Sequence, residues 1–242
     1  MSMNPENMEF KAAEALSMEN QDAVLESASL EPKLMEVPGM GEVLVGGDPY
    51  GIADRLDDHQ GDNILNLLGD CGLVSVTNIA IQAGLDVTED DVALTAVRNG
   101  LCVVHNDNDP THNGATDVYD RQALLGSLGI SATVHAPWTG NALSPEAIAE
   151  FVEAGHVVNI SVNAGYAWND ANYIQDGNSN HSIMVTGTVR DPETGDLKGL
   201  IVCDSGVPGR SNATVLTMDT LNDAYVRANG ASALVTDRPI AA

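Results

Sequence analysis

The chain has 242 residues, enough for one globular domain with an ordinary core, and its 10 Lys and Arg against 35 Asp and Glu give a formal charge of −25. So acidic a surface repels nucleic acids and anionic membranes, which excludes both as expected partners. The three cysteines lie far apart, with neither a disulfide framework nor zinc-ligand spacing, and we expect no cofactor and no metal.

The first fifty residues differ in character from the rest. They are rich in methionine and acidic side chains, and Pro and Gly interrupt them at 37–39 and 46–49. We therefore expect an acidic, loosely ordered leader or docking segment over residues 1–50 and a single domain over residues 51–242. Acidic residues stand where a signal peptide needs basic ones, and no apolar run is long enough to span a membrane. We expect a cytoplasmic protein, or one exported by a signal-independent route.

Helical spacing dominates the next part of the chain. Small and acidic residues precede Cys71, and the apolar spacing after it predicts a buried helix that starts at the cysteine and ends at Gly84. Capping residues and closing glycines predict three more helices, over residues 88–98, 118–128 and 144–155. The polar stretch over residues 105–116 is expected to form a surface loop or the rim of a cleft.

The period then changes from helical to alternating. This pattern predicts strands over residues 156–162, 181–189 and 199–204, the last two joined by a turn at 191–196. A short helix near 219–228 and an edge strand over 233–236 complete the chain. Helices first and antiparallel strands afterwards indicate an α+β domain.

Cys71 is the first candidate for chemistry. The unpaired N–H groups and the positive dipole end of a helix start favour a thiolate over a thiol, and a thiolate is what a cysteine nucleophile needs. The alternative is that Cys71 is a small core residue.

The predicted hairpin supplies a base. If its turn is centred between Glu193 and Thr194, residue 183 lies opposite 204, and His181 is one diagonal step from Asp204. Cys71, His181 and Asp204 then form a nucleophile, a base and a group that orients the base. Taken singly, His181 is equally well a surface histidine and Asp204 a turn residue.

Three short motifs carry a family resemblance: Gly69-Asp70-Cys71-Gly72, the run Asn180-His181-Ser182-Ile183-Met184-Val185-Thr186-Gly187, and Val202-Cys203-Asp204-Ser205-Gly206. They resemble the papain-like cysteine peptidase superfamily, in particular its bacterial branch of bacteriocin-leader-processing (double-glycine) peptidases, over residues 58–240. The resemblance implies a helical lobe, whose nucleophile helix packs on an antiparallel β-sheet lobe, with a cleft between them. It also implies that Cys71 is the nucleophile, His181 the base and Asp204 the orienting carboxylate.

One position departs from this family. Many papain-like enzymes place a glutamine six residues before the cysteine to donate to the oxyanion, and here that residue is Leu65. Gln60 and Asn66 are the two candidates for an amide that joins the Cys71 N–H in an oxyanion hole. In the segment before His181, Gly165 and Gly177 are expected to let a substrate backbone approach closely.

The resulting functional hypothesis is a cysteine peptidase that hydrolyses peptide bonds of a protein substrate through an acyl-enzyme. One alternative is a protein-glutamine deamidase, because the same triad serves both reactions. Another is a catalytically idle, acidic protein-binding module. The family resemblance also implies a bacterial effector or toxin, with an inhibitor or immunity protein as a partner. Self-processing after Gly46-Gly47 is a minor hypothesis, because leader peptidases of the related branch cut after paired glycines.

Overall fold

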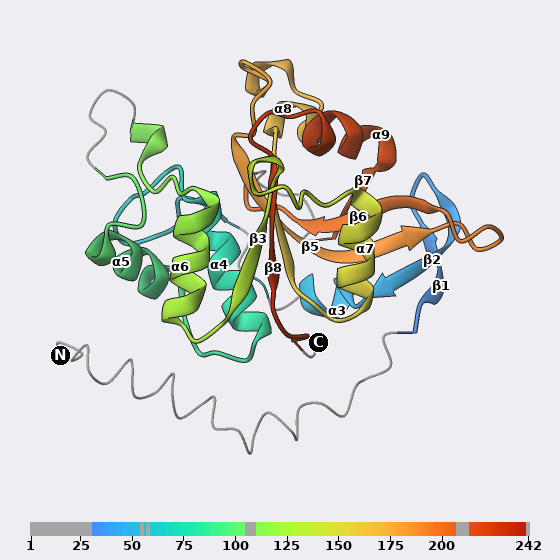
Figure 1. Ribbon diagram of the computed structural model, residues 1–242, viewed down its shortest axis with the longest axis horizontal. Coiled ribbons are helices and arrows are strands. Elements are labelled where there is room, and N and C mark those ends of the chain that lie inside the picture. The colour runs from blue at the N-terminus through green and yellow to red at the C-terminus, as the bar shows by residue number, and fades with distance from the viewer. Residues whose placement is uncertain (1–30, 54–55, 57–58, 105–109, 207–212, 241–242) are drawn as a thin grey trace.

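The computed structural model describes residues 31–53, 56, 59–104, 110–206 and 213–240. Within them, α4, α5 and α6 gather beside an antiparallel sheet, whose strands fan out beneath α7, with α8 and α9 at one end (Figure 1). The helices are α3 (Pro49–Ala53), α4 (Cys71–Gln82), α5 (Glu89–Asn99), α6 (Val118–Ser127), α7 (Pro145–Glu153), α8 (Ala164–Trp168) and α9 (Met218–Leu221), which continues as a π-turn (Asn222–Val226). Three short 3₁₀ turns cover Pro110–His112, Pro137–Thr139 and Ala171–Tyr173.

The strands form one sheet in the order β1-β2-β5-β4-β8-β3, with β6 on the other edge of β5 and β7 beyond β6. They are β1 (Lys33–Val37), β2 (Gly41–Gly47), β3 (Ala132–His135), β4 (Val158–Val162), β5 (His181–Arg190), β6 (Leu197–Cys203), β7 (Thr214–Thr217) and β8 (Ser232–Thr236). The predicted α+β class, with a helical layer packed on an antiparallel sheet, is confirmed. β5 is the central strand, because it pairs with β4 and β2 along one edge and with β6 along the other.

Local sequence signals placed the helices well. Thr88 forms a capping box with Asp91 at the start of α5, and Ser144 accepts the N–H of Ala147 at the start of α7. The predicted edge strand at 233–236 is wrong in position: β8 lies between β4 and β3. All five of its residues are buried, as expected for a central strand.

Residues 33–47 belong to the sheet, which corrects the predicted loose segment over residues 1–50. β2 pairs with β5, with Gly47 opposite Gly187, and Val43 and Val45 are buried against Ile201. Residues 1–30 lie outside the described residues, so that part of the predicted segment is neither supported nor contradicted. The Gly46-Gly47 pair has a packing reason, since a Cβ on Gly46 would lie 2.5 Å from Thr188 Oγ1. Cleavage after Gly47 would require β2 to leave the sheet.

The core has a separate cluster on each side of β5. Met184 packs with Leu73, Val76 and Ile79 of α4, whereas Ile183 and Val185 pack with the cluster of α7. This alternation lets one strand anchor helices on both of its faces. α4 is buried from Gly72 to Ala80, so its first residue is fixed relative to β5.

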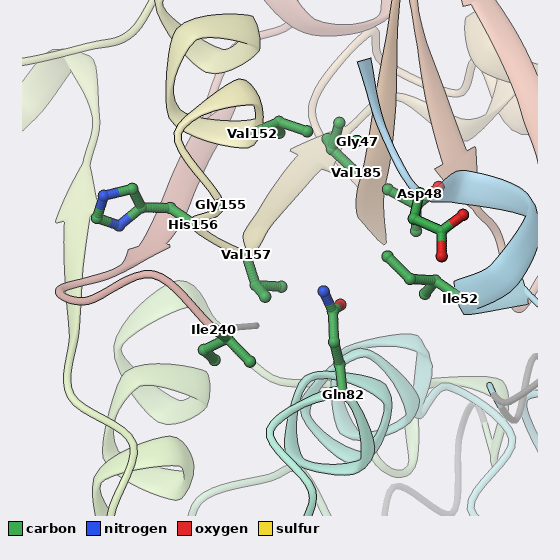
Figure 2. Close-up of a pocket in the computed structure, with 11 residues that line it drawn as sticks. Gly47, Asp48, Ile52, Gln82, Val152, Gly155, His156, Val157, Val185 and Ile240 are labelled. Atoms are coloured by element: carbon green, nitrogen blue, oxygen red, sulfur yellow. The ribbon is translucent and has the colours of Figure 1, made fainter. Parts of the chain in front are cut away.

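A small interior cavity lies at the far end of α4 from Cys71 (Figure 2). Its volume is about 20 Å³, room for a single water molecule rather than a substrate. Gln82, the last residue of α4, points into it beside Ile52 and Val157, and its Oε1 has no hydrogen-bond partner among the described residues. Gln82 lies eleven residues after Cys71 along α4, about 16.5 Å at 1.5 Å each, which separates this cavity from the candidate site.

Candidate active site

Cys71 is the first residue of α4 and is partly exposed, as the sequence pattern predicts. The preceding Asp70 occupies the N-cap position, but its carboxylate does not cap the helix. It accepts the backbone N–H of Gly61 at 2.8 Å and the amide of Asn63 at 2.9 Å instead. The exposed end of the helix dipole is therefore left to act on the Cys71 sulfur.

His181 and Asp204 meet as the predicted hairpin register requires. Met184 lies opposite Cys203, which continues to residue 183 opposite 204. Nε2 of His181 lies 2.7 Å from Oδ1 of Asp204, and the two residues are only 6% and 3% exposed. With Nε2 engaged by the carboxylate, Nδ1 is the ring nitrogen that remains for Cys71.

Asp204 is held by three donors in all. Besides His181, its Oδ2 accepts the indole N–H of Trp168 at 2.7 Å, and its Oδ1 accepts the N–H of Gly206 at 2.9 Å. The Trp168 ring also stands edge-on to the imidazole, with centroids 5.0 Å apart. Trp168 therefore fixes the carboxylate and covers the imidazole, a role that the sequence reasoning missed.

The electrostatics of these residues favour a thiolate–imidazolium pair. Burial raises the pKa of Cys71, but the hydrogen bond and charge of His181, the charge of Arg121 and the N–H of Ser182 outweigh it, so the pKa is lowered overall. Burial lowers the pKa of His181, but Asp204 and Cys71 together raise it to about 10. Despite burial, the charge and hydrogen bond of His181, together with the hydrogen bonds from Trp168 and Gly206, lower the pKa of Asp204 to about 2.

A buried carboxyl pair lies behind the start of α4. Asn63 donates to both Asp70 Oδ2 at 2.9 Å and Glu89 Oε1 at 3.3 Å, and Asp70 also hydrogen-bonds Glu89. Burial raises the pKa of Asp70, and its hydrogen bonds offset this only in part. The carboxyl group of Asp70, next to Cys71, is therefore harder to ionise than an ordinary one. The sequence analysis does not single out Glu89, which lies in the helix predicted over residues 88–98.

The two oxyanion candidates occupy different environments. The backbone N–H of Gln60 donates to Ser205 at 3.1 Å and its side-chain amide donates to the Leu68 carbonyl at 3.2 Å. Because Gly61 donates to Asp70, the chain at residues 60–61 runs between the neighbour of Asp204 and the neighbour of Cys71. Asn66 is exposed in a turn, with a left-handed φ of 53°. Gln60 is thus bonded to the residue that follows Asp204, and the amide that would donate to an oxyanion stays a prediction.

The two glycines expected to admit a substrate have other reasons to be glycine. A Cβ on Gly165 would lie 2.2 Å from the Ile174 backbone nitrogen, so this position lets α8 pack on the following turn. Gly177 has a φ of +79°, which a turn requires. That expectation is therefore wrong for Gly165, whose space the chain itself fills.

The described residues contain no group of three or more His, Cys, Asp or Glu side chains arranged to hold a metal ion. Their helices also fall short of the length and apolarity that crossing a bilayer demands.

Comparisons with known proteins bring out a few similar chains. No protein-family model matches the sequence. Uncharacterized proteins of Mycobacterium tuberculosis (strains H37Rv and CDC 1551) and Mycobacterium bovis are each 28% identical to it over 185 residues, covering 69% of this chain and 77% of theirs.

Two solved structures are similar to this chain. One is a double-glycine-motif protease from an AMS/PCAT transporter in complex with the leader peptide, with a TM-score of 0.43, 13% identity, and coverage of 69% of this chain and 84% of that one. The other is a putative C39-like peptidase from Bacillus anthracis, with a TM-score of 0.47, 17% identity, and coverage of 70% and 90%.

Proposed function

We propose that this chain is a cysteine peptidase that hydrolyses peptide bonds of a protein substrate. The observation that carries the proposal is the position of His181, which Asp204 holds at 2.7 Å through one ring nitrogen and which lowers the pKa of Cys71 at the start of α4. A nucleophile, a base and an orienting carboxylate are the minimal set for acyl transfer through a thioester.

The Cys71 thiolate attacks the scissile carbonyl carbon, and the carbonyl electrons move onto oxygen. The backbone N–H of Cys71 and the side-chain amide of Gln60 are our candidates to donate to that oxyanion. Collapse of the tetrahedral intermediate expels the amine, which takes its proton from His181. Water then attacks the thioester while His181 accepts its proton, which releases the acid and restores the thiolate.

Orientation of the imidazole is what the surroundings of Asp204 support. The carboxylate is fixed by Trp168 and Gly206 as well as by His181, so the imidazole is held in one tautomer and one rotamer before substrate arrives. A residue that served only to cap a turn would not need three donors in a buried position.

The test is incubation of the wild type with a bacterial lysate, followed by mass spectrometry of new peptide termini. Cys71→Ala and His181→Ala should abolish the new termini, and Cys102→Ala, a matched change at a partly buried cysteine elsewhere, should leave them unchanged. An uncleaved target that carries glutamate in place of glutamine would instead establish the deamidase. Equal outcomes for wild type and Cys71→Ala would favour the idle binding module. Delivery as an effector or toxin, and an immunity protein as partner, stay predictions from the sequence.

A further inference from the structure

Arg121, on α6, is a buried cation without a carboxylate partner among the described residues. Its side chain is 4% exposed, and within the described ranges it forms no ion pair. Its terminal nitrogens donate to the Ser161 hydroxyl at 2.6 Å and, at 3.4 Å each, to the carbonyl and hydroxyl oxygens of Thr116. Its Nε is buried with no hydrogen-bond partner in that same part of the chain. Neutral oxygens alone do not offset the cost of burying a guanidinium, so an anion is expected nearby.

The carboxylates of the same helix are engaged in its capping. Asp117 accepts the N–H groups of Tyr119 and Asp120, and Asp120 accepts the N–H of Asp117. Their charges reach Arg121, but neither bonds it. Among the charges that support the protonated guanidinium against its burial, that of Cys71 is foremost.

The Arg121 side chain lies against the first turn of α4. A Cβ on Gly72 would lie 3.1 Å from Arg121 Cδ and 2.0 Å from Thr116 Oγ1. The residue after the cysteine is therefore a glycine, which leaves space for both side chains. A cation beside the positive end of a helix dipole is unfavourable unless an anion lies between them. Cys71, the first residue of that turn, carries a group able to become such an anion, its thiol.

The far end of Arg121 is tied to the strands that carry His181. Ser161 of β4 accepts a hydrogen bond from the guanidinium. It lies opposite Ser182 of β5, the residue that follows His181. The Ser75 hydroxyl lies 3.2 Å from that of Ser182 and donates to the Cys71 carbonyl at 2.9 Å. The guanidinium therefore has a fixed place relative to both Cys71 and His181.

We propose that Arg121 is a second cation of the active site, a positioning residue that holds the Cys71 thiolate from α6 while His181 holds it from β5. The inference deepens the proposed function and rests on its assignment of Cys71 as a thiolate nucleophile. Among the described residues, the charged or titratable groups around Cys71 are Arg121 on α6 and His181 on β5, with Asp204 behind it. The residue before Cys71, Asp70, is a further one and is paired with Glu89 of α5.

The test is the pH dependence of iodoacetamide alkylation at Cys71 in the full chain, followed by peptide mass spectrometry. Arg121→Gln keeps donors for Ser161 and removes the charge, whereas Arg121→Lys keeps the charge. For Arg121→Gln we expect the profile to move by about one pH unit upward, so that alkylation near pH 6 is about tenfold slower and the rates converge at alkaline pH. Arg121→Lys should stay close to the wild type, as should Ser161→Ala, which keeps the guanidinium.

A pH profile of Arg121→Gln that superimposes on that of the wild type would overturn the inference. An equal loss of alkylation rate at every pH in Arg121→Gln and Arg121→Lys would overturn it as well. If Arg121→Gln does not fold by circular dichroism, His181→Ala decides, since Arg121 is then the remaining cation. In the His181→Ala variant, Cys71 should still react with iodoacetamide faster than Cys102 near pH 8. Equal rates would contradict the proposed role of Arg121. Failure of the proposed function looks different: the Arg121 effect persists, but the lysate shows no cleavage that depends on Cys71.

Discussion

The protonation states of Cys71 and His181 set the pH range in which the site can act. With the pKa of Cys71 lowered and that of His181 raised to about 10, the ion pair forms below the ordinary thiol range and is lost as pH rises through about 10. We expect the rate of peptide hydrolysis to rise on an acid limb below pH 8.5 and to fall on an alkaline limb near 10. Thiolate absorbance near 240 nm, titrated in parallel, should follow the acid limb. A single rise centred near pH 8.5 would mean that no ion pair forms.

The same residues affect folding stability with a definite sign. The pKa of His181 in the fold is above its usual 6.5, so its contribution is complete below that value and disappears as pH rises through about 10. The pKa of Asp204 is lowered from 3.8 to about 2, so its contribution is present above 3.8 and is lost as pH falls toward 2. The gap in melting temperature between wild type and His181→Ala should therefore narrow at both extremes.

The residues of the site differ in how far the sequence alone can find them. Cys71 and His181 were predicted because each begins a regular element with a clear pattern. Trp168 and Arg121 carry no such local signal, since their partners Asp204 and Ser161 lie 36 and 40 residues away. Only the folded chain brings these pairs together.

At the level of elements, the first turn of α4 depends on the bare position at Gly72. Gly72→Ala places a methyl group 2.0 Å from Thr116 Oγ1, and we expect it to destabilise the fold by about 1–3 kcal/mol and to slow alkylation of Cys71. Gly126→Ala is the matched control, because it lies in α6 with nothing within 4 Å of the added Cβ. It should stabilise by about 0.5–1 kcal/mol, by the helix preference for Ala over Gly. Chemical denaturation measures the free energy of unfolding of both variants. Equal effects would show that Thr116 and Arg121 do not pack tightly against the first turn of α4.

Elements built from neighbouring residues were predicted well, and those built from distant ones were not. The β5–β6 register followed from the position of one short turn, and it is retained at Met184 opposite Cys203 despite two bulges further along. The place of β8 between β4 and β3 depends on pairings across much of the chain. β3 itself, with four residues, was not predicted because its pattern is too short to distinguish.

For the whole molecule, the question is where the folded unit begins. β2 contributes backbone pairing to β5 and buried valines to a core cluster, so a chain that starts at residue 48 should unfold at a lower temperature and lose selective alkylation of Cys71. A chain that starts at residue 31 keeps every described strand and should retain both properties. Thermal unfolding and peptide mapping of the two truncations provide the measurement. Unchanged behaviour of the shorter chain would restore a boundary near Gly47.

The candidate site and the molecule as a whole differ in their balance of positive and negative charges. Two of the site's side chains act as anions, Cys71 and Asp204, and two as cations, His181 and Arg121, so these four charges cancel within a molecule whose formal charge is −25. Buried charges at such short range are screened little by dissolved ions, whereas the field outside the molecule is screened within about 8 Å at physiological ionic strength. Added salt should therefore weaken the capture of cationic peptides while leaving the bond-breaking step unaltered. The acidic exterior then selects what arrives, and the four balanced charges of the site determine how fast it reacts.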